Sequence, residues 1–390
     1  MTGPGPRRYD RTVAAVRDAL RRAAAGFAIF LGFFHPVPAS AATGSFLMGD
    51  QSVVQVLAGA RSEITVRGWD RPNVQFDTDD EAAQVTRRPI TFGTVQTPLS
   101  VSIPVQTISV RDPVTGVMGR GTLAPEEFPY ASDFRAGAHD TVRIQTAEDS
   151  HITVMIPPTT ALLVTRIQKG QGVVSINDYH GGTLFALSPG GRMMLNDVMS
   201  AAFVQLMSGR LDVVDSSFDR LRARGNGAAF VFEHNRARQI EVSTVSGNIV
   251  YDNGTFDPGL ARFESTNGSI GIGVAAGAQV AAHSTDGHVY SMWDRRTPLD
   301  QRGDNDVSAT IAGGGPVVNA VTSRGNVYLY DGALASRGLL PSEWRPIRQT
   351  IAASQQPIPA RLQPQPLPPP QPLQPPNAFQ RFRALRGREL

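Results

Sequence analysis

Cysteine is absent from the 390 residues of this chain. Disulfide bonds, thiolate metal sites and cysteine nucleophiles are therefore excluded, and so is a lipid anchor on a cysteine. Lysine is nearly absent, because Lys169 is the only one and arginine carries almost all the positive charge. Charged residues make up 18% of the chain, which has 38 glycines and 29 prolines. This composition favours an all-β protein with many turns.

The net charge of +3 comes from the two ends of the chain. Residues 1–41 contain six arginines and two aspartates, and residues 345–390 contain seven arginines and one glutamate. Residues 42–344 contain 24 basic and 31 acidic residues, so the body of the protein is acidic. Nucleic acid is an unfavourable partner for such a body, because phosphate binding needs clustered lysine and arginine.

Glycines recur about every nineteen residues in the second half of the chain, with apolar residues at fixed offsets around them. From Gly247, the offsets −7, −5, +2 and +4 hold Ile240, Val242, Ile249 and Tyr251. Two intervals are twice as long, and Asn226 and Asn305 stand where the missing steps should be. The glycines are Gly172, Gly191, Gly209, Gly247, Gly268, Gly287 and Gly325.

Period-two alternation inside a period of about nineteen predicts an all-β fold, a β-solenoid column of stacked coils. We expect the glycines to mark corners at which φ is positive, with asparagine as the next most tolerant residue. Side chains at alternate positions should point inward. The expected inward row comprises Leu195, Leu211, Val213, Ile249, Ile270, Ile272, Val289, Val327 and Leu329.

Residues 1–41 resemble a secretory signal peptide. Six arginines precede an apolar run from Ala23 to Phe34, and Ala39-Ser40-Ala41 has the form of a cleavage site. Twelve apolar residues are too few to span a bilayer as a helix. We therefore expect export to the periplasm or cell surface. The alternatives are an uncleaved anchor or a cytosolic amphipathic helix, and Met1 need not be the true start.

The rest of the chain divides into four further parts. Residues 42–169 should form an irregular β region, with a hairpin around the turn at residues 68–73 and a long loop at 98–137. Residues 170–332 should form the solenoid and 333–354 a C-terminal cap, for which Leu334, Leu339, Leu340 and Trp344 are available. Residues 355–390 should be a disordered tail rich in proline and glutamine.

The tail ends in a segment of arginines and phenylalanines after its proline-rich stretch. This segment is suited to an anionic surface, which makes membrane lipid or a wall-associated polymer a possible partner. The alternative is a solvated tail without a partner. The arginines concerned are Arg381, Arg383, Arg386 and Arg388.

The chain resembles the putative-adhesin β-strand repeat family of bacterial envelope proteins, a domain family of unknown function. The resemblance covers residues 50–332 and includes the segment from Ile64 to Asp70 and the strand from Ile152 to Pro158. It also includes Ser243–Ile249, Ser265–Ile270, Ser284–Val289 and Thr322–Val327, which are four related segments in step. The resemblance implies a β-solenoid and an exported location, and it carries no catalytic residue with it.

Candidate chemical sites are few. Histidines occur beside acidic residues at His180, His234, His283 and His288, but the corner positions contribute no paired carboxylates of the kind a glycan hydrolase needs. Residues 304–306 have calcium-type ligands without the glycine-rich repeats of such sites. We therefore predict no catalytic, cofactor-binding or metal-binding residue.

The expected function is that of an exported, non-enzymatic envelope protein, adhesin-like or scaffolding, which binds an envelope glycan or protein. One alternative is a polysaccharide-active β-helix enzyme, which would need the carboxylates of the 98–137 loop. The other is a solenoid that polymerises through uncapped ends. The loop carboxylates are Asp112, Glu126, Glu127 and Asp133.

Overall fold

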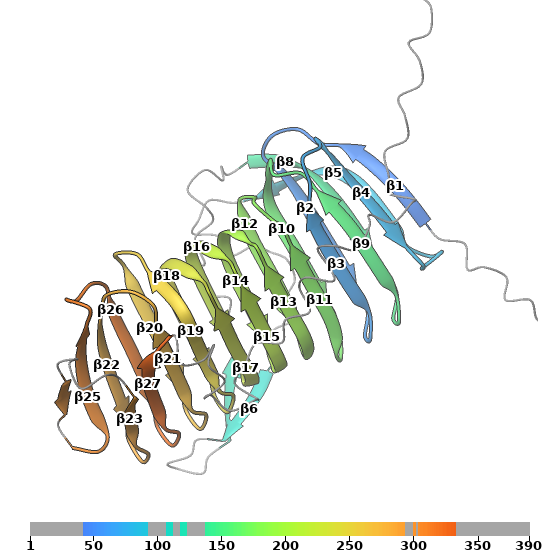
Figure 1. Ribbon diagram of the computed structural model, residues 1–390. Coiled ribbons are helices and arrows are strands. Elements are labelled where there is room, and N and C mark those ends of the chain that lie inside the picture. Colours follow the sequence, from blue (N-terminus) through green and yellow to red (C-terminus); the bar gives the residue numbers. More distant parts are fainter. Residues whose placement is uncertain are drawn as a thin grey trace, which may run out of the picture.

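The computed structural model describes residues 42–92, 107–111, 118–122, 137–292, 299–301 and 303–332. All regular elements in these ranges are β-strands, and they form the long column of Figure 1. The expected all-β solenoid is confirmed. The expected signal peptide, cap and tail, and most of the 98–137 loop, lie outside the described residues. No helix in the described ranges is long and apolar enough to cross a membrane.

The strands line two faces of the column, which we name sheet B and sheet A. In spatial order, sheet B contains β5 (Gln84–Phe92), β8 (Gly137–Gln145), β2 (Ser52–Ala58), β10 (Thr160–Ile167), β12 (Thr183–Ser188), β14 (Met199–Leu206), β16 (Ser217–Arg224), β18 (Arg236–Thr244), β20 (Leu260–Ser265), β26 (Val317–Thr322), β22 (Ala278–Ser284), β25 (Asp306–Ile311) and β24 (Leu299–Gln301).

Sheet A follows the same axis. Its strands are β1 (Ala42–Leu47), β4 (Asn73–Thr78), β9 (His151–Ile156), β3 (Glu63–Gly68), β11 (Gly172–Asn177), β13 (Gly191–Asn196), β15 (Ser208–Val214), β17 (Gly227–Glu233), β19 (Ile249–Phe256), β21 (Ile270–Val274), β27 (Val327–Asp331) and β23 (Val289–Met292).

Each coil consists of a sheet B strand followed by a sheet A strand, and neighbouring coils pair in parallel. Leu184 of β12, for example, lies between Leu163 and Ala202 of the adjacent coils. Stacking at about 4.8 Å places side chains of equal offset in continuous rows. One apolar cluster fills the space between the sheets, and the whole expected inward row is buried in it.

The spatial order of the coils departs from the sequence order at both ends. The β8–β9 coil lies outside the β2–β3 coil, and β26–β27 lies between β20–β21 and β22–β23. The extra step at Asn226 is confirmed, because the following strand β17 pairs with β15 and β19. The extra step at Asn305 is wrong, because β25 runs antiparallel to β22.

Two expectations for the N-terminal region need correction. The segments around Ile64 and Phe76 do not form a hairpin, because β3 and β4 lie on opposite sides of β9. The residues expected as a loop at 98–137 contain the antiparallel pair β6 (Thr107–Arg111) and β7 (Met118–Thr122). The strands β5 and β8 that flank this stretch pair directly with each other.

The glycine corner, where a sheet B strand turns into a sheet A strand, has a different cause from the one expected. Of the seven predicted glycines, only Gly191 and Gly209 have positive φ, at 100° and 104°. A Cβ on Gly247 would overlap the carbonyl oxygen of Ala228, and one on Gly268 would overlap that of Gly247. Close contact between coils therefore requires most of these glycines. Neither Asn226 nor Asn305 has positive φ.

Candidate binding groove

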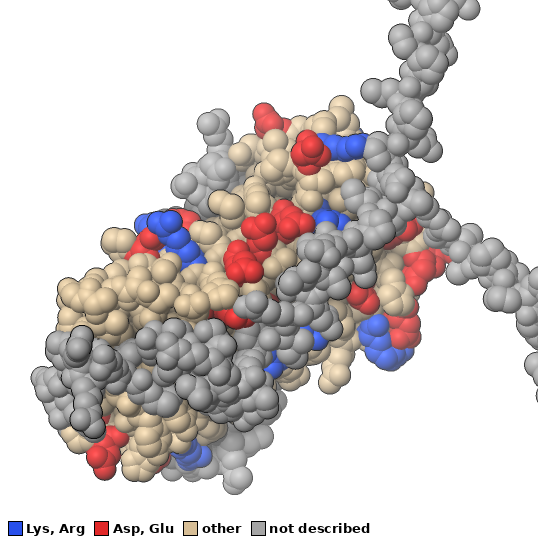
Figure 2. Space-filling model, viewed as in Figure 1, with Lys and Arg blue, Asp and Glu red and all other residues tan. Residues whose placement is uncertain are grey.

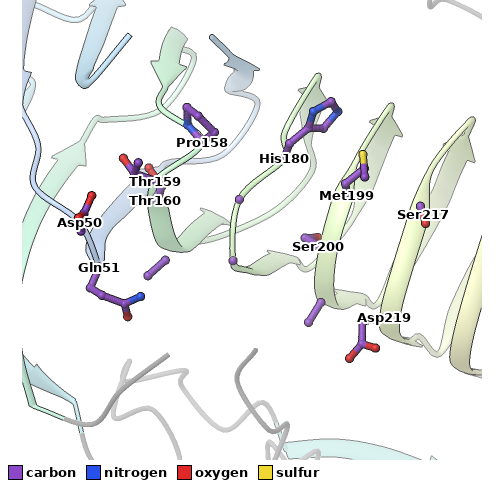
Figure 3. Close-up of a pocket in the computed structure, with 14 residues that line it drawn as sticks. Asp50, Gln51, Pro158, Thr159, Thr160, His180, Met199, Ser200, Ser217 and Asp219 are labelled. Carbon is purple, nitrogen blue, oxygen red and sulfur yellow. The ribbon is translucent and has the colours of Figure 1, made fainter. Parts of the chain in front are cut away.

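A groove of 680 Å³ lies where sheet A strands turn into sheet B strands, beside the first residues of β10, β12, β14 and β16 (Figure 3). We name this edge the left-handed corner, because successive coils turn there through a residue with positive φ. Its residues are Asp178, Asp197, Asp215, His234 and Asn253, with φ between 49° and 56°.

The backbone at this corner is tied from coil to coil. The amides of Asp178, Asp197 and Asp215 donate to carbonyl oxygens of the next coil at 3.1 to 3.2 Å. Short polar side chains such as aspartate tolerate the left-handed conformation better than most residues. The turns therefore repeat at a constant position, so the strands that follow them begin in line and form one wall.

The wall consists mainly of small and hydroxyl-bearing residues. Thr160, Gly182, Ser200 and Ser217 come from four successive coils and line the groove. A Cβ on Gly182 would overlap the carbonyl oxygen of Ala161, so this position accepts no side chain. No side chain projects from the wall at Gly182, which leaves room for a ligand at this point of the groove.

Some polar atoms of the groove are enclosed and have no hydrogen-bond partner among the residues that the structure describes. They are Gln51 Oε1, Thr160 Oγ1 and Ser200 Oγ. A buried polar group without a partner costs about 1–3 kcal/mol. The hydroxyls and the amide could regain that energy by rotating toward a ligand that carries O–H or N–H groups.

The charges at the groove are few and mostly paired. The guanidinium of Arg238 contacts the Asp219 carboxylate at 2.5 and 3.0 Å, and this hydrogen bond lowers the pKa of Asp219. His180 Nε2 lies 3.2 Å from the Asp197 carboxylate. Lysine and arginine do not occur among the described lining residues. In Figure 2, acidic side chains gather over the middle of the visible face.

Among the described lining residues, the carboxylates do not form an acid–base pair. Figure 3 shows Asp50 at one end and Asp219 at the other, separated by several coils. Proton transfer in glycan hydrolysis uses two carboxylates that flank one bond. The described lining therefore offers hydrogen-bonding groups for a ligand rather than paired catalytic carboxylates.

Of the histidines considered from sequence, His180 alone lines the groove. His234 lies 3.3 Å from Asp215 on the same edge, whereas His283 lies 3.9 Å from Asp306 in the final coils. Of the residues considered as calcium ligands, Asp304 and Asn305 precede β25 and Asp306 begins it. Within the described ranges no three such side chains are placed to hold a metal.

The polar side chains beside the glycine corner form hydrogen bonds between neighbouring coils. Asn248 Oδ1 accepts from the amide of Ser269, and the Ser269 hydroxyl accepts from the amide of Asn326. The amide of His288 then donates to Asn326 Oδ1 at 3.0 Å. These side chains join one coil to the next, which agrees with the interpretation of the row as ordinary corner residues.

Sequence analysis missed the left-handed corner, although a signal for it was present. Asp178, Asp197 and Asp215 recur at the same spacing as the glycines. The glycine row predicts only one edge of the column, because glycine is the usual turn residue. An equally regular row of aspartates, each directly after a predicted strand, would have indicated the second edge and hence the groove.

A family model described as Toastrack DUF4097 matches residues 130–329, which is more than half of the chain. The chain belongs to the Toastrack family. This match confirms the resemblance to the adhesin-like repeat family that the sequence indicated. In this Toastrack protein, β2 and β3 precede the matched region but lie inside the stack, between β8–β9 and β10–β11.

Similarity to individual proteins is slight. A crystal structure of a putative cell adhesion protein from Clostridium sporogenes aligns with 75% of this chain and 100% of its own, at 9% identity and a TM-score of 0.22. That score is too low to support a structural argument for this Toastrack protein. No curated protein matches its sequence.

Proposed function

We propose that this protein is an exported, non-enzymatic component of the bacterial envelope that binds an extended neutral glycan in the groove at its left-handed corner. The observation that carries the proposal is the repeated wall, to which Thr160, Gly182, Ser200 and Ser217 contribute from successive coils. A polymer with a regular series of hydroxyl groups is suited to a surface that repeats at about 4.8 Å.

The chemistry of the lining favours a neutral ligand. The lining groups that have no partner within the described part of the chain are hydroxyl and amide oxygens, and the carboxylates of the lining would repel a polyanion. Ligand sites are typically concave with a few well-placed polar groups, and hydroxyl-rich ligands satisfy buried polar atoms that are otherwise unpaired. An adhesin-like or scaffolding role follows if the glycan belongs to the envelope.

The proposal is tested by replacing a groove residue and a matched residue at the opposite corner. Ser200→Trp fills the groove, whereas Ser246→Trp changes an exposed serine at the glycine corner. On an array of neutral envelope glycans, we expect Ser200→Trp to abolish binding and Ser246→Trp to retain it. Equal binding by both variants would contradict the groove assignment, and release of reducing ends by the wild type would contradict the non-enzymatic role.

Export and membrane attachment belong to the same proposal. The leader predicts cleavage after Ala41 or Ala42, and N-terminal sequencing of the protein from cell fractions tests this. An intact Met1 in the soluble cytoplasm would rule it out. We also expect the full chain to bind vesicles of anionic lipid. This binding should be lost when glutamine replaces Arg381, Arg383, Arg386 and Arg388.

A further inference from the structure

An aromatic cluster lies on the outer face of sheet A near the C-terminal end of the column, where His288 and Tyr290 are exposed and Tyr328 is half-buried. Tyr290 of β23 and Tyr328 of β27 are register partners, and their rings stack with centroids 5.2 Å apart and planes at 20°. The ring of His288 lies 5.9 Å from that of Tyr290, with the two planes at 53°. We name these three residues the tyrosine platform.

The platform is held in place by neighbouring polar groups. Asn326 Nδ2 donates to the Tyr328 hydroxyl at 3.2 Å, and Asn326 Oδ1 accepts from the amide of His288. Tyr290 remains 45% exposed despite its stacking. The rings are therefore preorganised on paired strands, which lowers the entropic cost of binding a ligand.

The chain contains a segment whose chemistry fits such a surface. Polyproline segments dock on exposed aromatic rings, because the polyproline II helix is already ordered before binding. Residues 355–377 are rich in proline and include Pro368-Pro369-Pro370. They follow β27, the strand that carries Tyr328.

The connection is long enough for this contact. Twenty-two residues separate Gly332 from Gln355, and fully extended they would span about 75 Å. The platform lies on β27 itself and on the neighbouring strand β23. A tethered segment has an effective concentration in the mM range, so a weak contact is sufficient.

We propose that the proline-rich segment 355–377 docks on the tyrosine platform of its own chain. Docking holds the basic end of the tail, from Arg381 to Arg388, at the C-terminal end of the column. The groove lies at other coils, so this inference does not depend on the proposed glycan ligand.

The experiment uses the full chain with the photoreactive residue p-benzoylphenylalanine in place of Gln371. After irradiation, mass spectrometry should locate intramolecular cross-links in the peptides that contain β23 and β27. Tyr290→Ala should lower the cross-link yield about tenfold, which corresponds to the upper range for an aromatic pair. Replacement of Pro368, Pro369 and Pro370 by glycine should have a similar effect.

The control is Leu47→Ala, which removes another exposed apolar side chain on β1, at the opposite end of the column. It should leave the yield unchanged, and circular dichroism should show the same β-sheet signal for all variants. Cross-linked dimers would instead assign the platform to a second copy. Cross-links spread over other strands, or cross-links lost in high salt, would assign the contact to the basic terminus. Each of these results overturns the proposal.

Discussion

At the scale of single residues, the glycine corner is defined by a hydroxyl group as much as by glycine. The Thr322 hydroxyl donates to the Gly268 carbonyl at 2.9 Å and accepts from the Gly325 amide at 3.2 Å. Thus one side chain closes its own turn and bonds to the neighbouring coil. Equivalent bonds are made by Thr244, Ser265 and Ser284.

Replacing one of these hydroxyls should be costly. Thr322→Val keeps the shape of a fully buried side chain and leaves the Gly268 carbonyl and the Gly325 amide without this partner. We expect the free energy of unfolding to fall by about 1–3 kcal/mol, measured by thermal or urea unfolding. Thr322→Ser retains the hydroxyl, so its free energy of unfolding should fall by less. An equal fall in the two variants would contradict the hydrogen-bond explanation.

Close contact between coils gives a second prediction. A Cβ on Gly247 would overlap the Ala228 carbonyl, whereas a Cβ on Gly49 would meet no atom within 4 Å. Gly247→Ala should therefore lower stability by about 1–3 kcal/mol. Gly49→Ala should stay within about 0.5 kcal/mol of the wild type. An unchanged free energy of unfolding for Gly247→Ala would show that the strands of neighbouring coils move apart easily at this position.

A buried tyrosine should make the protein sensitive to alkali. Burial raises the pKa of Tyr251 well above its ordinary value, and the Asp257 carboxylate raises it further. The unfolded chain therefore releases this proton above pH ~10 while the folded protein retains it. The stability difference between the wild type and Tyr251→Phe should shrink by about 1.4 kcal/mol per pH unit above 10. Urea unfolding across that range measures it, and a constant difference would contradict the shift.

At the scale of elements, the coils are coupled in an order that the sequence does not follow. β26 lies between β20 and β22, although β22 precedes it in the chain. A single coil cannot bury its apolar face alone, so each depends on its spatial neighbours. Damage to β26 should therefore spread to a segment that comes earlier in the sequence.

Hydrogen exchange can detect this spread. Ala320 of β26 is fully buried, so Ala320→Asp places a charge in the core. We expect faster amide exchange in β22 and β23 as well as in β26 and β27. The matched change Asn319→Asp, on the outward side of the same strand, should have little effect. Faster exchange confined to residues 317–331 would contradict the intercalated order.

At the scale of the whole molecule, antiparallel strands cover both sheets at one end of the column and the edge of sheet B at the other. β1, β4 and β5 close one end, and β25 and β24 cover the edge of β22 at the other. Exposed parallel edges would template the addition of further strands, and proteins commonly block them. This arrangement disfavours the polymerising alternative. We expect a monomer whose scattering is elongated and independent of concentration.

Uncovering one edge should change that behaviour. Ala309→Pro removes a ladder hydrogen bond from β25, which pairs with β22 through Val280. The variant should associate as concentration rises, measured by light scattering, whereas Ser308→Ala at an exposed position of the same strand should remain monomeric. A monomeric Ala309→Pro variant would show that β25 does not block association.

The sequence repeat alone determined the class of fold, the inward rows and the extra coil at Asn226. Strand alternation and coil length are local properties, so they appear in the sequence as residues of one kind at a fixed spacing. Four other features required the tertiary structure. They are the intercalation of β26–β27, the antiparallel placement of β25, the position of β4 beside β9, and the groove. Strand pairing between distant segments depends on which strand edge is still unpaired when the chain folds back onto the column. The residues of β25 and β4 do not themselves indicate which edge that is. The groove exists only because corners far apart in sequence stack in register.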